Sequence, residues 1–175
     1  PREGVSSTVA NLGSWLAEQG KQRVLLIDAN LRNSTLHKLF KLEEADGLAD
    51  VIEGRINIAQ AVTKINSNLS VMTAGRTSVN PLTLLTEPAM ADTIKTLRAN
   101  YDLILIDTPA LSRCKDAAII AGYTDGSIIV IHEGRTRRPV VLTALTALKE
   151  KKNKLLGAVL NKRTYPIPGM IYKRV

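Results

Sequence analysis

Two runs of aliphatic residues, each ending in an aspartate, constrain the fold of this chain more than any other feature. Residues 24–27 read Val-Leu-Leu-Ile and precede Asp28, and residues 103–106 read Leu-Ile-Leu-Ile and precede Asp107. Unbroken apolar runs are typical of parallel strands that are covered on both faces. Nucleotide phosphates bind at the carboxyl ends of such strands, where an aspartate can hold magnesium-bound water or orient an attacking hydroxyl.

The first eight residues, Pro-Arg-Glu-Gly-Val-Ser-Ser-Thr, have the pattern of a phosphate-binding loop that leads into a helix. Such a loop needs small residues, a helix N-terminus, a lysine for the outer phosphates and a hydroxyl for magnesium. Gly4 fits the last glycine of the loop, Ser6 fits the magnesium hydroxyl, and Ser6 and Ser7 are good N-cap residues. Val5 stands at the lysine position. Taken alone, the segment could equally be a serine-capped helix after a glycine turn.

The rest of the chain alternates between predicted strands and predicted helices. We expect strands at about residues 23–29, 69–74, 103–107, 127–132 and 155–160, and helices at about 6–19, 36–40, 48–52, 88–100, 116–121 and 139–152. This alternation predicts an α/β fold, with a P-loop NTPase-like parallel sheet and helices on both faces, in three α/β/α layers.

Length and composition indicate one domain over residues 1–175 in a reducing compartment. The chain of 175 residues is long enough to bury a core, and its one cysteine, Cys114, excludes an internal disulfide framework. No stretch of ~18 apolar residues, the length of a membrane span, occurs. Because the loop begins at residue 1, we expect the strand that should precede it to be missing from this sequence.

The basic excess lies at the C-terminal end. Residues 135–175 hold eleven Lys and Arg residues and one acidic residue, Glu150. This asymmetry indicates an anionic partner such as a membrane surface, a nucleic acid or a phosphorylated neighbour, although a solvated helix face would look the same. One Phe and one Trp give little for nucleic-acid bases to stack on, so nucleic acid is the disfavoured partner.

Several segments together resemble the cytoplasmic domains of bacterial tyrosine kinases that control capsule and exopolysaccharide assembly, a branch of the deviant-Walker P-loop ATPases. The resemblance covers nearly the whole chain. It rests on P-R-E-G-V-S at residues 1–6, R-V-L-L-I-D-A-N-L-R at 23–32, N-P-L-T-L-L at 80–85, Y-D-L-I-L-I-D-T-P-A at 101–110 and G-A-V-L-N-K-R at 157–163.

The resemblance implies ATP and magnesium as cofactors. Asp28 would organise magnesium and activate a tyrosine hydroxyl, Asp107 would be the Walker B aspartate, and Ser6 would ligate the metal directly. Asn161 would lie near the adenine, and Arg32 would shape the site or a subunit contact. The implied nucleotide-binding residues are Gly4, Val5, Ser6, Ser7, Asn161 and Arg163.

Three positions depart from the family pattern. Val5 replaces the catalytic lysine, Asn30 replaces the second aspartate of the D-x-D-x-R pattern, and Ala110 replaces a common second proline. Phosphoryl transfer depends on electrostatic stabilisation, so the loss of the lysine alone could raise the barrier by several kcal/mol. We therefore expect the binding of ATP and magnesium to be weak or lost unless another cation, with Arg2 the nearest in sequence, compensates.

The basic segment 164–175 contains two tyrosines, Tyr165 and Tyr172. Because the family autophosphorylates a tyrosine cluster in its C-terminal tail, both are phosphoacceptor candidates. The same segment could instead dock through Ile167, Met170 and Ile171.

Three functional hypotheses follow. The preferred one is a degenerate kinase domain that regulates polysaccharide polymerisation and export at the cytoplasmic face of the bacterial inner membrane. It would work with an inner-membrane polysaccharide co-polymerase or transmembrane activator, in the same chain or another, and as a homo-oligomer. The alternatives are an active ATP-dependent tyrosine autokinase and a partitioning-type ATPase that binds DNA through its basic C-terminal third.

Overall fold

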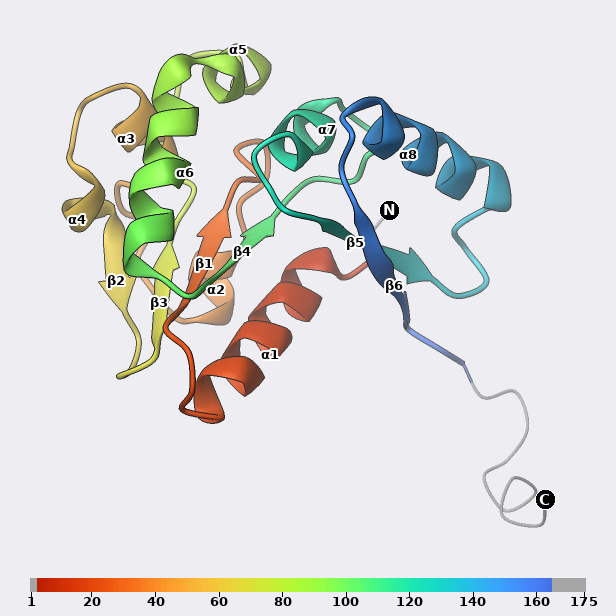
Figure 1. Ribbon diagram of the computed structural model, residues 1–175, viewed down its shortest axis with the longest axis horizontal. Helices are drawn as coiled ribbons and strands as arrows, with labels where there is room; N and C mark the ends of the chain where they lie inside the picture. The colour runs from red at the N-terminus through yellow and green to blue at the C-terminus, as the bar shows by residue number, and fades with distance from the viewer. Residues whose placement is uncertain (1–2, 165–175) are drawn as a thin grey trace.

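The computed structural model describes residues 3–164 and has helices on both sides of a central sheet (Figure 1). The strands are β1 (Val24–Asp28), β2 (Val62–Lys64), β3 (Leu69–Met72), β4 (Leu103–Asp107), β5 (Ser127–His132) and β6 (Leu155–Asn161). The helices are α1 (Val5–Glu18), α2 (Leu36–Leu39), α3 (Leu48–Ile52), α4 (Ile58–Ala61), α5 (Pro81–Thr86), α6 (Pro88–Asn100), α7 (Asp116–Ala121) and α8 (Arg138–Glu150). No helix among the described residues is long and apolar enough to cross a membrane.

The main sheet has the strand order β2-β3-β1-β4, and β1 runs parallel to both β3 and β4. The register pairs Val24 with Leu103 and continues to Asp28 opposite Asp107. The two aspartates predicted to end parallel strands therefore lie side by side at the carboxyl edge of the sheet, as the apolar runs indicated.

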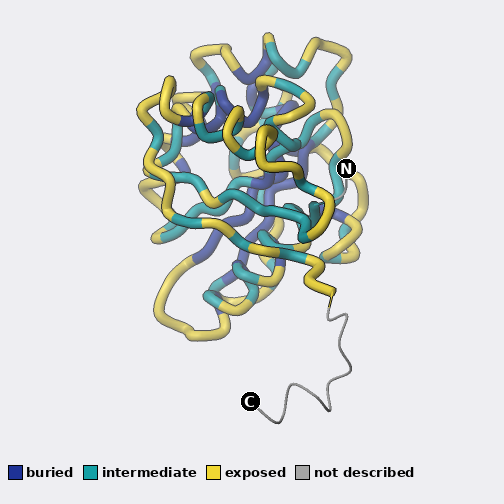
Figure 2. Tube along the Cα trace, turned by 90° about the vertical axis from the view of Figure 1, so that its right-hand side faces the viewer, coloured by how far each residue is buried: buried dark blue, intermediate teal, exposed yellow. Residues whose placement is uncertain are grey.

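Each face of this sheet packs against its own set of helices, and that is why the strands are apolar throughout. Leu25 and Ile27 of β1 join a core with α3, α5 and α6, whereas Val24 and Leu26 join a second core with α1 and α2. All five residues of β1 are buried, and Figure 2 shows the buried stretches running through the interior. The prediction of an α/β fold with helices on both faces is confirmed.

Helix α1 lies close to the sheet because its sheet-facing positions are small. Ala10, Gly13 and Ala17 are its buried residues, and a Cβ added at Gly13 would collide with the side chain of Leu26. This close packing fixes the position of the helix N-terminus relative to the ends of β1 and β4.

Strands β5 and β6 form a separate parallel pair in the described part of the chain, with no hydrogen-bonded partner in the main sheet. Strand β4 is as apolar in sequence as β1, yet its first four residues are only half-buried. The difference arises on the side of β4 that faces β5, where no described strand pairs with it.

The predicted parallel sheet carries one antiparallel strand at its edge. Strand β2 pairs with β3 in the antiparallel direction, and an antiparallel edge strand is common on otherwise parallel sheets. Helices α4 and α5 and strand β2 are short elements that the predicted alternation did not include. The capping box of Asn57 and Gln60 begins α4, and Asn80 caps the N-terminus of α5.

Candidate functional site

The phosphate-binding loop closes onto α1 through a glycine in the left-handed conformation. Gly4 is the N-cap of α1 with φ 87° and ψ 32° and offers no capping side chain. The Thr8 backbone N–H and hydroxyl both donate to the Gly4 carbonyl, at 3.0 and 2.9 Å. The backbone N–H groups of residues 5–7 have no acceptor among the described hydrogen bonds. They are thus available to an anion at the positive end of the helix dipole.

Asn161 at the end of β6 holds this loop in place. Its side-chain amide donates to the Glu3 carbonyl at 2.8 Å, and its side-chain oxygen accepts from the Lys162 backbone N–H at 2.8 Å. A Cβ at Gly4 would collide with the Asn161 amide nitrogen, so Gly4 is required both by its positive φ and by this contact. Asn161 thus lies against the loop, and its predicted place near the adenine stays a prediction.

Asp28 is fully buried at the carboxyl end of β1 and serves as a local structural anchor. One carboxylate oxygen accepts the Asn30 backbone N–H at 3.1 Å, and the other accepts those of Thr35 and Leu36 at 2.9 and 3.0 Å. Burial raises the pKa of Asp28, and these three hydrogen bonds oppose the rise. Because a carboxylate has about four lone-pair sites, Asp28 keeps capacity for one further hydrogen bond from a substrate or a metal-bound water.

Asp107 is also fully buried, but neither of its carboxylate oxygens has a hydrogen-bond partner among the described residues. Burial, together with the nearby charge of Asp28, raises the pKa of Asp107 to about 7. The Ser6 hydroxyl and the Thr108 backbone N–H lie near enough to oppose part of this rise. A buried carboxylate without partners is costly unless something binds it, and a hydrated cation would supply the missing charge and donors.

These residues fit a magnesium site of the kind that binds nucleotide. Magnesium in such sites takes one or two carboxylates, waters and substrate phosphate oxygens rather than a cage of protein ligands. Asp107 and the Ser6 hydroxyl could hold the ion, and Asp28 could hold one of its waters. No group of three or more His, Cys, Asp or Glu side chains that could ligate a metal occurs within residues 3–164.

The loop position that normally provides a lysine carries an aliphatic side chain. Val5, the first residue of α1, carries an aliphatic side chain at the lysine position and lines the cavity beneath the loop. The second departure, Asn30, uses its side-chain oxygen to accept the Asn33 backbone N–H at 3.2 Å. Asn30 therefore builds the turn after β1 rather than contributing charge.

Two predicted arginines form ion pairs with acidic residues of other segments. Arg32 makes a two-pronged ion pair with the buried Asp116 at the start of α7, at 2.7 and 3.2 Å. Arg163 is directed toward Glu133, with 3.9 Å between its Nε and a carboxylate oxygen. Arg32 thus ties the turn after β1 to α7, which agrees with a role in shaping the site. Arg2, Tyr165 and Tyr172 lie outside the described residues.

The structure adds one residue that sequence reasoning did not single out. The Cε atom of Lys162 lies 3.9 Å from the position that a Cβ on Gly4 would take. Lys162 has a positive φ of 54°, in the left-handed region, directly after the end of β6. Its place directly after Asn161 is the only signal that the sequence carries.

The comparisons with known proteins agree with this geometry. A family model described as an AAA domain matches residues 3–157. The tyrosine-protein kinase YwqD of Bacillus subtilis is 41% identical over 162 residues, which cover 92% of this chain and 68% of YwqD.

Solved structures match over almost the whole chain. The VpsO kinase domain superposes with a TM-score of 0.87 at 31% identity, covering 94% of this chain and 81% of that one. The chimerical protein CapA2B2 gives a TM-score of 0.87 at 29% identity, with 94% and 73% covered. The chain therefore belongs to the bacterial tyrosine-kinase family, within the P-loop proteins described by the AAA domain model.

Proposed function

We propose that this chain is a nucleotide-site domain of a bacterial tyrosine-kinase system, one that regulates the polymerisation and export of exopolysaccharide or capsular polysaccharide. In this proposal its ATP-dependent tyrosine autophosphorylation is weak or lost. One observation carries the proposal: the loop at Gly4 converges with Asp28 and Asp107 at one sheet edge, while an aliphatic Val5 stands at the lysine position.

Different residues of the chain would bind the phosphate, hold the metal and orient the acceptor in such a site. The free backbone N–H groups at the start of α1 bind phosphate, and Gly4 lets the backbone approach it closely. Ser6 and Asp107 would hold a magnesium ion, which would neutralise phosphate charge. Asp28, anchored by three backbone hydrogen bonds, orients an acceptor hydroxyl or a metal-bound water.

Val5 removes a transition-state contact while leaving the framework intact. A charged hydrogen bond contributes about 1.5–3 kcal/mol, and it contributes most where charge develops on the transferred group. Nucleotide binding is therefore weakened and phosphoryl transfer is weakened further. A domain of this kind acts through assembly with its partners.

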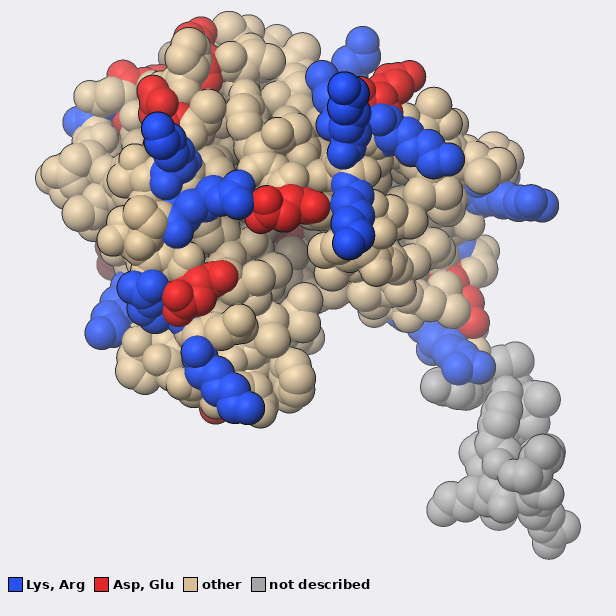
Figure 3. Space-filling model, viewed as in Figure 1, with Lys and Arg blue, Asp and Glu red and all other residues tan. Residues whose placement is uncertain are grey.

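The partners follow from the same proposal. The domain works at the cytoplasmic face of the inner membrane with a polysaccharide co-polymerase or transmembrane activator, in the same chain or another, and as a homo-oligomer. The exposed lysines around the end of α8, which are Lys149, Lys151, Lys152 and Lys154, support an anionic membrane surface nearby. In Figure 3 basic side chains are spread over the visible face, with acidic ones beside several of them.

An active autokinase is the second candidate, and the position of Lys162 favours it. Its ammonium group follows a Cε atom that lies beside the loop at Gly4, and a lysine there could replace the charge missing at Val5. The relatives that match are tyrosine kinases, so a DNA-binding partitioning ATPase is the weaker alternative.

Mass spectrometry after incubation with ATP and magnesium tests the proposal. The expected result is little or no phosphate on Tyr165 and Tyr172, compared with an Asp107→Asn variant as the inactive control. Stoichiometric phosphotyrosine that disappears in Asp107→Asn would overturn the proposal of weak or lost activity and establish the autokinase.

A further inference from the structure

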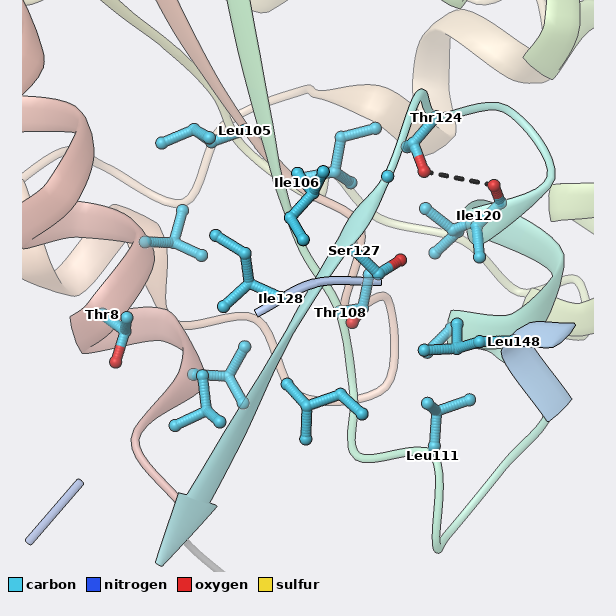
Figure 4. A pocket seen from close by; sticks show the side chains of 18 of the residues that line it. Thr8, Leu105, Ile106, Thr108, Leu111, Ile120, Thr124, Ser127, Ile128 and Leu148 are labelled. Atoms are coloured by element: carbon cyan, nitrogen blue, oxygen red, sulfur yellow. Dashed lines mark hydrogen bonds between the residues drawn. The ribbon is translucent and has the colours of Figure 1, made fainter. Parts of the chain in front are cut away.

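Helix α8 has one side turned into the protein and another side open. Val141, Ala144 and Leu148 line the cavity between β4 and β5, and Figure 4 shows Leu148 at the wall of this cavity. Leu148 is buried, whereas Leu142 on the outer side of the helix is 51% exposed. Because α8 is held in place through its inner side, its outer side can meet a partner without any rearrangement of the fold.

The outer face of α8, which we define as Pro139, Leu142, Thr143 and Thr146, is less polar than its two hydroxyl groups suggest. These four residues are exposed, and their spacing of three and four residues places them on one side of the helix. The Thr143 hydroxyl donates to the Pro139 carbonyl and the Thr146 hydroxyl to the Leu142 carbonyl, each at 3.1 Å. Both hydroxyl protons are therefore used within the helix, so moving this face into less polar surroundings leaves no hydroxyl donor without a partner.

Basic residues flank the outer face at both ends. The segment 135–154 holds seven exposed Lys and Arg residues against one acidic residue, Glu150. Three of the seven, Arg135, Arg137 and Arg138, precede or begin α8, and the other four are the lysines around its end. None of the seven belongs to an ion pair in the described part of the chain. Their charge is thus not neutralised within the domain and remains available to an anionic partner.

The size and chemistry of this face favour a lipid surface over a small anion or a nucleic acid. Helix α8 has 13 residues and is therefore about 20 Å long, so its two basic ends cannot share one phosphate group. A nucleic acid offers no apolar layer to Leu142, and α8 has no aromatic residue on which bases could stack. A bilayer interface presents anionic groups and an apolar layer side by side.

We propose that the outer face of α8 docks on an anionic lipid bilayer, with the helix axis parallel to the membrane plane. Leu142 and Pro139 enter the headgroup layer, and the long side chains of Arg138 and Lys149 reach the lipid phosphates on either side of them. This inference rests on the proposed function, which sets the domain at the membrane, and deepens it by naming the surface that makes the contact. That surface contains none of the residues of the nucleotide site.

Sedimentation with lipid vesicles, without nucleotide or magnesium, tests the proposal. At low salt the chain should bind vesicles of phosphatidylcholine that contain about 30% phosphatidylglycerol and should not bind pure phosphatidylcholine vesicles, because the attraction is to the anionic lipid. Each cation close to the surface should contribute about fivefold to the partition coefficient. Rising salt concentration should weaken the binding, since it screens this attraction.

Paired charge variants locate the contact. Arg138→Gln combined with Lys149→Gln removes one cation from each end of the face and should lower the partition coefficient about 30-fold. The matched control, Lys21→Gln combined with Lys64→Gln, removes the same charge from two exposed positions. These positions follow the end of α1 and lie on β2, which are away from α8 in Figure 1. The control pair should lower the partition coefficient less than about threefold, because its charges are remote from the membrane.

A pair of leucine variants tests whether the face enters the headgroup layer. Leu142→Gln should lower the partition coefficient about fivefold, because it removes an apolar side chain from the interface and keeps the charge. Leu39 on α2 is 46% exposed, so Leu39→Gln makes the same change outside the face and should leave the binding unchanged. Both variants should unfold near the wild-type Tm, because both side chains are already exposed.

Three outcomes would overturn the proposal. The first is no binding to the anionic vesicles at low salt, and the second is an equal loss in the two charge pairs, which would mean that any basic surface of the chain suffices. The third is binding that Leu142→Gln does not change, because α8 would then stay outside the headgroup layer. Tighter binding to a DNA duplex than to the vesicles would also count against it and would assign the face to nucleic acid. These readouts involve neither nucleotide nor phosphotyrosine, so a failed docking surface and a failed nucleotide site give different results.

Discussion

Replacing Asp107 with asparagine should stabilise the ligand-free protein at neutral and higher pH. Both carboxylate oxygens of Asp107 are buried without a hydrogen-bond partner, and burial beside Asp28 raises its pKa from 3.8 to about 7. A folded-state pKa above the unfolded value means that the folded protein binds the proton more tightly. The contribution to stability is therefore fully present below about pH 4 and is lost as the pH rises through about 7.

The magnitude follows from the size of the shift. Each pKa unit corresponds to about 1.4 kcal/mol, so the wild-type protein should lose roughly 4 kcal/mol of stability from this group over the whole window. Between about pH 5 and pH 7 the loss should be roughly 2–3 kcal/mol. Asp107→Asn keeps the shape of the side chain and removes the titration, so it should show no such loss.

Denaturant unfolding without magnesium or nucleotide, between about pH 5 and pH 8, measures the effect as a difference between variant and wild type. That difference cancels the titration of groups distant from Asp107 and reports Asp107 together with its coupling to the neighbouring Asp28. The control is Asp125→Asn, because the Asp125 side chain is 85% exposed and its curve should parallel the wild type. If the Asp107→Asn and wild-type curves stay parallel across the range, Asp107 is not held in the environment described here. The same variant should lose magnesium-dependent nucleotide binding.

Three further changes probe the loop and its supports. Gly4→Ala should lower the unfolding free energy by about 2–3 kcal/mol, because alanine disfavours the left-handed backbone and displaces Asn161 from its hydrogen bond to Glu3. Adding Asn161→Ala should relieve the clash with the new Cβ, so thermal unfolding of the double variant should show a cost smaller than the sum of the two single costs. Arg32→Ala should cost about 2–3 kcal/mol, because it leaves the buried Asp116 carboxylate unpaired; a cost below that of an ordinary surface substitution, about 0.5 kcal/mol, would contradict the anchoring role. Lys162→Met should weaken ATP binding at least about threefold at low salt, because it removes a positive charge beside the phosphates, whereas Lys162→Arg should retain the affinity. Equal ATP affinities of the two variants would show that Lys162 does not belong to the site.

The arrangement of the two aspartates could be predicted because local sequence and topology agree there. Unbroken aliphatic runs belong to strands buried on both faces, and the carboxyl ends of adjacent parallel strands meet at one edge. Asp28 and Asp107 therefore had to come together if their strands were neighbours, and the register places them opposite each other. The glycine of the loop placed the start of α1 to within one residue, but the prediction of Ser6 and Ser7 as N-cap residues was wrong, because Gly4 is the N-cap and both serines lie inside the helix.

Other features depend on contacts that no local pattern reports. The antiparallel direction of β2 is set by its pairing with β3. The hydrogen bond from Asn161 to Glu3 joins residues at opposite ends of the described chain. The ion pair between Arg32 and Asp116 links the turn after β1 to α7. The sequence around either residue does not identify the other as its partner. Such pairings become visible only once the strand order is known.

Calorimetric titration of ATP with magnesium into the wild-type protein and a Val5→Lys variant tests the central claim most directly. The claim is that Gly4, Ser6, Asp28 and Asp107 form a nucleotide framework that lacks one cation. A restored charged hydrogen bond of about 1.5–3 kcal/mol corresponds to an affinity gain of roughly 10- to 150-fold, and Val5→Met is the control that should give none. An affinity in Val5→Lys that is equal to that of the wild type, or the absence of binding in both, would show that the site has lost more than its lysine and would contradict the account.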